Sequence, residues 1–133
     1  MFRTIAALAL AAGLAGAAYA GGGHAIEGTE AATGSFAGES GHVTTGTGSL
    51  IQADGKWYIS LADDFVFDGA PDPKVALGND GYDADTLLEP LKANAGAQVY
   101  EIPATIDPTQ YNEIWIWCEQ FSVPLGVASL TTN

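Results

Sequence analysis

Residues 114–125, IWIWCEQFSVPL, contain the strongest strand signal of the chain and its single cysteine, Cys118. Two sets of side chains alternate here: Ile114, Ile116 and Cys118 on one face, and Trp115, Trp117 and Glu119 on the other. This alternation has the period of a β-strand. Both faces are apolar as far as Glu119, a pattern typical of a strand covered on two sides. We therefore expect a central or near-central strand with Cys118 buried against the core.

Other short apolar runs are separated by turn residues along the chain. Asp54-Gly55 lies between a Thr-rich run at 43–52 and an alternating run at 57–61, which predicts a β-hairpin. Asp107-Pro108 has the features of an N-cap followed by proline at the first helical position, which predicts a single helical turn. The pattern as a whole predicts an all-β fold, an antiparallel β-sandwich or small barrel of about seven to nine short strands.

The N-terminal residues have the pattern of an export signal. Arg3 precedes an Ala/Leu-rich run, and Ala18-Tyr19-Ala20 matches an A-x-A cleavage site, so residues 1–20 are predicted to be a signal peptide. The apolar run is shorter than the roughly 20 residues that a membrane span needs. We expect a flexible leader at 21–34, a folded domain at 35–133, no membrane span after cleavage, and a periplasmic or extracellular location.

The charge of the processed chain restricts its partners. Cleavage would remove Arg3 and leave three lysines against sixteen acidic residues, a net charge of −13. Nucleic acids and anionic lipids are bound through clustered Lys and Arg. The composition therefore argues against both classes of ligand.

Cys118 has three alternative roles, because a single cysteine cannot close an internal disulfide. It is a buried small hydrophobe, a ligand, or a thiol that acts on a partner. Burial and the adjacent Glu119 both disfavour a thiolate, which favours the inert core role. His42 is a weaker ligand candidate at the start of a strand, and His24 is expected to be solvated in the leader.

No further chemical motif is recognised in the sequence. One cysteine and two histidines do not match a zinc motif, and the acidic loops at 68–72 and 79–85 lack the EF-hand ligand pattern, so no metal site is predicted. There is no nucleophile elbow, phosphate-binding loop or dinucleotide fingerprint. A conventional hydrolase or transferase activity is therefore unsupported.

Four segments carry a resemblance to a known family. They are residues 36–46 with His42, residues 61–72 with a Gly-Ala-Pro-Asp loop, residues 96–103 (GAQVYEIP), and residues 111–130 with WIWCEQFSVPLGVASL. In this order they resemble the DM-thirteen domain, the electron-transfer domain found in Skeletor-type proteins, over about residues 35–130. The insertion of Ala70 in the Gly-Pro-Asp loop departs from the family pattern.

The resemblance implies an extracytoplasmic β-rich domain with a redox or electron-transfer role centred on Cys118. The cysteine would act as a bare thiol or hold a group such as haem. We add His42, from its place at the start of a strand and not from the resemblance, as a weaker candidate for a second contact to haem iron. The partner would be an electron-transfer or cell-surface protein. The alternative function is a non-enzymatic extracytoplasmic binding or adhesion module, in which Cys118 is an inert core residue.

Overall fold

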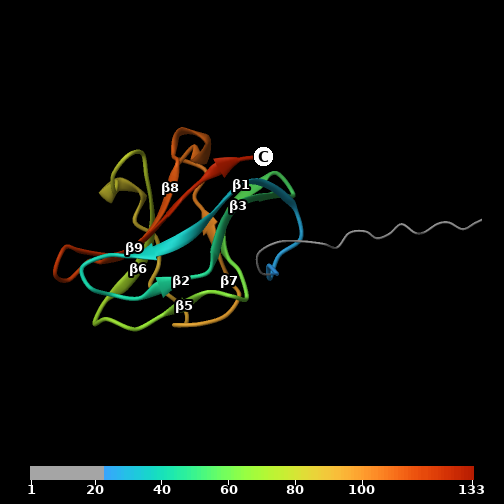
Figure 1. Ribbon diagram of the computed structural model, residues 1–133. Coiled ribbons are helices and arrows are strands. Elements are labelled where there is room, and N and C mark those ends of the chain that lie inside the picture. The colour runs from blue at the N-terminus through green and yellow to red at the C-terminus, as the bar shows by residue number, and fades with distance from the viewer. Residues whose placement is uncertain (1–22) are drawn as a thin grey trace, which may run out of the picture.

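The computed structural model describes residues 23–133, and within this range the chain is all-β (Figure 1). The strands are β1 (Thr29–Gly38), β2 (Thr44–Thr45), β3 (Thr47–Ala53), β4 (Lys56–Leu61), β5 (Val66–Phe67), β6 (Pro73–Gly78), β7 (Gln98–Ile102), β8 (Glu113–Cys118), β9 (Val123–Ser129) and β10 (Thr131–Thr132). Two 3₁₀ turns, η3 (Ala84–Thr86) and η4 (Pro108–Gln110), complete the described elements. The predicted fold class is confirmed. The described residues form ten strands because the run at 43–52 is divided into β2 and β3, and because β5 and β10 are strands of only two residues.

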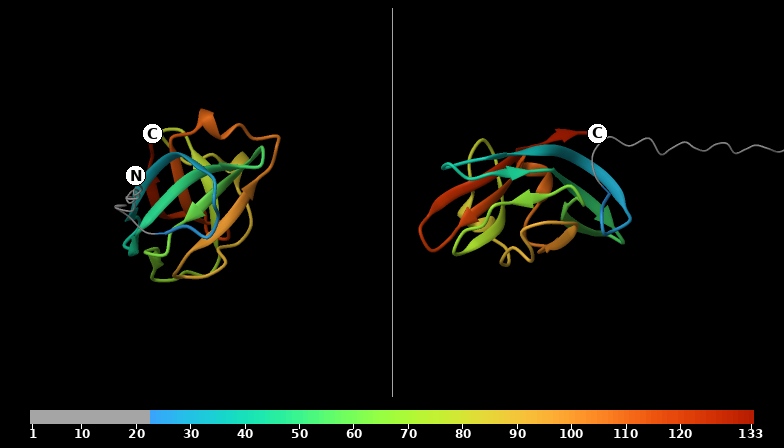
Figure 2. Two further views of the ribbon diagram at one scale, coloured as in Figure 1. Left: turned by 90° about the vertical axis from the view of Figure 1, so that its right-hand side faces the viewer. Right: turned by 60° about the horizontal axis from the view of Figure 1, so that its bottom comes forward.

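The longer strands form one antiparallel sheet in the order β6-β8-β9-β1-β3-β4-β7, with β10 also paired to β1. Figure 2 shows that this sheet curls strongly around the core. β1 joins its two halves, because residues 29–35 pair with β3 and residues 36–38 pair with β9. The short β2–β5 ribbon is a separate two-stranded sheet.

Local turn chemistry explains several of these elements. Asp54 and Gly55 both have positive φ, 52° and 76°, as a two-residue hairpin turn of this type requires, and they connect β3 to β4. Asp107 caps η4 through its side chain, with Pro108 at the first position. Pro73 is the first residue of the edge strand β6, where a missing N–H costs no ladder hydrogen bond.

The leader predicted at 21–34 is wrong for its second half. Residues 29–34 are the N-terminal half of β1, and residues 21–22 lie outside the described range. Ala32 is 5% exposed, and a side chain at Gly34 would collide with the backbone of Ser129. The small residues that suggested flexibility therefore permit close approach of neighbouring strands.

The core lies inside the curled sheet. Its fully buried side chains include Tyr100, Phe65, Ile59 and Leu61. β8 contributes to this core through alternate residues, and it lies between β6 and β9, one strand from the edge of the sheet. β8 is therefore an interior strand, as predicted, but it is second from the edge, and its outer face with Trp115 and Trp117 is only half-buried.

Candidate functional site

Cys118 is the last residue of β8 and faces the core with Ile114 and Ile116. It is 2% exposed, which confirms the predicted burial. Its register partners are Pro73 on β6 and Val123 on β9. Within residues 23–133 no hydrogen bond to its sulfur is found. The thiol thus lies in an apolar environment at the end of a strand, where the chain leaves the core for the surface turn at 119–122.

A β-bulge connects this strand end to the segment that carries His42. The β8–β9 register shifts between Ile116 and Trp117, so that Leu125 has no direct partner on β8. The Leu125 carbonyl instead accepts hydrogen bonds from the Glu39 N–H at 3.1 Å and from the Thr44 hydroxyl at 2.9 Å. Bulges commonly redirect a strand beside a functional site. Here the bulge fixes the turn at 39–43 against the hairpin that follows Cys118.

His42 forms a close pair with Asp68. The two side chains meet at 2.9 Å between Nδ1 and Oδ1, while Asp68 Oδ2 accepts the Val43 N–H at 3.0 Å. The hydrogen bond to His42, with that from Val43, holds the pKa of Asp68 below its ordinary value. A carboxylate at Nδ1 orients a histidine ring and sets its tautomer, as it does for metal-binding histidines. In the part of the chain described, Nε2 of His42 has no hydrogen-bond partner.

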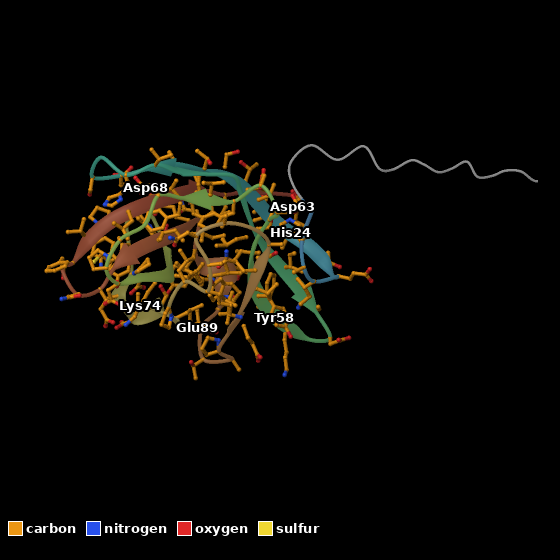
Figure 3. All side chains as sticks on the ribbon, turned by 90° about the horizontal axis from the view of Figure 1, so that it is seen from below. His24, Tyr58, Asp63, Asp68, Lys74 and Glu89 are labelled. Atoms are coloured by element: carbon orange, nitrogen blue, oxygen red, sulfur yellow. The ribbon has the colours of Figure 1, made fainter. Side chains whose placement is uncertain are left out.

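The 68–72 loop connects this pair to the hairpin after Cys118. Asp72 accepts the Glu119 N–H at its backbone carbonyl and the Gln120 N–H, at 2.9 Å, at its side chain. Lys74 forms ion pairs with Glu119 and, at 3.8 Å, with Asp72. We call the three segments 39–43, 68–72 and 119–122 the loop end. In Figure 3 the labelled Asp68 and Lys74 both lie at this end of the molecule.

Cys118 and His42 belong to the same end of the fold but not to one ligand set. Cys118 faces the core, whereas the His42 side chain is 27% exposed and bonded to Asp68. Within residues 23–133 no group of three or more His, Cys, Asp or Glu side chains is arranged to hold a metal ion. A haem iron would need an accessible sulfur and an open space beside it. The buried thiol of Cys118 does not fit that requirement.

His24 lies at the opposite end and is not the solvated residue that we expected (Figure 3). Its Nδ1 is 2.7 Å from Ser60 Oγ, and its Nε2 is 3.3 Å from both Ser49 Oγ and Glu30 Oε2. The set has the composition of a hydrolytic triad, but both serines are fully buried and inaccessible to a substrate. His24 instead satisfies two buried hydroxyls and anchors the segment before β1.

The sequence offers no signal for the His24 network, because its members are separated by up to 36 positions and meet only when β3 pairs with β4. The His42–Asp68 pair, 26 positions apart, was also missed, although His42 itself was a candidate. In residues 23–133 no helix is long and apolar enough to cross a membrane.

Comparison with known proteins identifies a family for most of the chain. The family model described as electron transfer DM13 matches residues 35–130, which include the loop end and Cys118. No curated protein and no solved structure gives a significant match.

Proposed function

The chain belongs to the electron transfer DM13 family, and we propose that it is an exported electron-transfer domain whose redox chemistry is centred on Cys118. The observation that carries the proposal is the meeting of three distant segments at the strand end where Cys118 lies. Residues 39–43, 68–72 and 119–122 are joined there by side-chain and backbone hydrogen bonds. Such convergence of loops on one end of a rigid sheet is typical of functional sites.

The burial of Cys118 restricts the kind of redox chemistry. A mixed disulfide with a partner requires an exposed thiolate, usually beside a cation. Cys118 is 2% exposed, and Lys74, on the adjacent strand β6, is already paired with Glu119 and Asp72. Electron transfer does not require contact between the partner and the buried group. One-electron chemistry is therefore the redox role that the packing favours.

Export is part of the proposal. The predicted signal peptide at 1–20 lies outside the described residues, and its removal would leave a chain with a net charge of −13. The proposed partner is an electron-transfer or cell-surface protein. An acidic domain of this kind favours a partner with a basic surface, because opposite charges accelerate encounter.

The test compares wild type with two variants, Cys118→Val and His42→Gln, all exported through the native signal. Valine keeps an apolar side chain of similar size in the core, so it removes the thiol with little strain. Protein-film voltammetry, a visible spectrum and metal analysis are recorded for each, with His24→Gln as the matched histidine control. We expect a redox wave in wild type that Cys118→Val abolishes and His24→Gln leaves unchanged. A wild type without a redox wave would contradict the proposal.

A non-enzymatic binding or adhesion module remains the second candidate because the loop end exposes apolar side chains. Phe121 is 58% exposed and Val43 is 55% exposed. In that case Phe121→Ser would abolish attachment of the protein to cells of its source, while Cys118→Val would bind as well as wild type. The opposite result would favour the redox role.

A further inference from the structure

The outer face of β8 carries a closely packed set of oxidisable aromatic rings. Trp117 stacks on Tyr82 with ring centroids 3.7 Å apart and an angle of 8° between the planes. Trp115 meets Trp117 edge to face at 6.3 Å, and its Nε1 donates to Glu113 Oε1 at 3.0 Å. These rings are half-buried, on the side of β8 opposite Cys118. An electron donor or acceptor at the surface can therefore approach them without opening the core.

Tyr111, a phenol that packs against the core, is connected to the stack through its proton acceptor Asp83, the residue that follows Tyr82. The Tyr111 hydroxyl donates to Asp83 Oδ2 at 3.0 Å, and Asp83 directly follows Tyr82 in the chain. This hydrogen bond raises the pKa of Tyr111, so the phenol is protonated and faces an acceptor carboxylate. The other oxygen of Asp83 accepts the Asp85 N–H at 2.9 Å, which fixes the carboxylate at the start of η3.

We propose that the Trp117–Tyr82 stack, on the outer face of β8, and the Tyr111–Asp83 pair together form a one-electron relay. Its biological use rests on the proposed electron-transfer function, whereas its chemistry does not require Cys118. A one-electron oxidant of the metal-complex class takes an electron from the Trp117 indole and leaves a radical cation. Tyr111 then gives an electron to Trp117 through Tyr82 and its phenolic proton to Asp83. The products are neutral Trp117, a neutral tyrosyl radical and protonated Asp83.

The chemistry of Trp117 and of the Tyr111–Asp83 pair matches the step proposed for each. An indole ring can lose an electron while keeping its proton, so Trp117 can act at the surface without a base. A phenol loses an electron far more readily when a base takes its proton in the same event, and Asp83 is within hydrogen-bond reach for that transfer. A one-electron reductant restores the pair when the proton returns from Asp83 to Tyr111.

The test is laser flash photolysis of the intact protein with tris(bipyridine)ruthenium(II) and a cobalt(III) ammine quencher. The ruthenium(III) ion produced is a strong one-electron oxidant, and its positive charge is attracted by the acidic chain. Transient absorption separates tryptophan radicals from tyrosyl radicals. In wild type we expect a tryptophan radical that decays as a tyrosyl radical grows in.

Four variants locate the steps. Trp117→Phe lowers the tyrosyl yield, and Tyr111→Phe removes the tyrosyl radical that forms after tryptophan oxidation. Asp83→Asn keeps a residue suited to capping η3 but removes the proton acceptor, so tyrosyl growth slows by at least about tenfold. Tyr82→Leu removes the ring that stacks on Trp117, so growth of the tyrosyl radical should slow.

Matched controls lie on β4, where Trp57→Phe and Tyr58→Phe should leave the growth of the tyrosyl radical unchanged. Equal loss in Trp57→Phe and Trp117→Phe, or unchanged kinetics in Asp83→Asn, would overturn the relay. The same photolysis on Cys118→Val separates the two proposals, because the relay predicts unchanged radicals there. If photolysis of Cys118→Val still gives the radicals, the relay is supported. If voltammetry of wild type gives no wave, the Cys118-centred function is contradicted, whatever the photolysis shows.

Discussion

Replacement of Cys118 by serine tests whether the thiol is only an apolar core group. The side chain is 2% exposed and packs with Ile114 and Ile116, and no hydrogen bond to its sulfur is found in the described part of the chain. A serine hydroxyl at this position would be buried without a partner, which costs about 1–3 kcal/mol. Cys118→Val replaces the thiol with an apolar group and should cost less than about 1.5 kcal/mol.

The difference between the two variants is the informative quantity. Urea unfolding followed by tryptophan fluorescence gives the free energy of unfolding of each protein, and a shared m-value shows that compactness is unchanged. We expect Cys118→Ser to be the less stable variant, with a loss of about 1–3 kcal/mol relative to wild type against less than about 1.5 kcal/mol for Cys118→Val. A serine variant as stable as the valine variant would mean that a polar partner faces this position and would refute the apolar environment.

The native thiol should also be protected from a disulfide reagent. Reaction requires opening of the strand end, and an opening free energy of about 3 kcal/mol slows labelling roughly a hundredfold relative to the protein in urea. Labelling of the native protein at the unfolded rate would show that Cys118 is accessible. In that event the mixed-disulfide chemistry that burial disfavours becomes the leading redox role.

Three further outcomes follow from the contacts and from the N-terminal sequence. Thr86→Val should lower the free energy of unfolding by about 1–3 kcal/mol in urea denaturation. The buried Thr86 hydroxyl accepts the Leu77 N–H and donates to the Leu77 carbonyl, and valine would leave both groups without this partner. Thr86→Ser keeps the hydroxyl and should cost less. Asp68→Asn should destabilise the protein at neutral pH but not in acid, as unfolding measured across pH would check. The hydrogen bond to His42 lowers the folded-state pKa of Asp68. The stability that the Asp68 carboxylate contributes is therefore complete above the ordinary pKa of 3.8 and is lost as the pH falls through the lowered pKa. Intact-mass analysis of the exported protein should show loss of residues 1–20, and a mature chain that retains Arg3 would contradict the signal peptide.

Local features of the fold were predictable from the sequence because their causes lie within a few residues. The Asp54-Gly55 turn depends on the positive φ that both residues adopt, and the η4 turn depends on the Asp107 cap. The alternation along β8 assigned Cys118 to the core face, since side chains of a strand alternate whatever the strand pairs with. The fold class followed from the number and spacing of such signals.

Tertiary structure alone decided the remaining features, because they join residues that are distant in sequence. Residues 29–34 lack a strand pattern, and they form part of β1 because β3 and β10 pair with them, with Gly34 leaving room for the backbone of Ser129. The Leu125 bulge that fixes the His42 turn depends on the pairing of β8 with β9 and on the approach of Thr44. The Tyr82–Trp117 stack likewise forms only where the loop after β6 folds back over β8. Periodicity therefore assigns a residue to a face of its strand, whereas the curl of the sheet determines which distant side chains meet there.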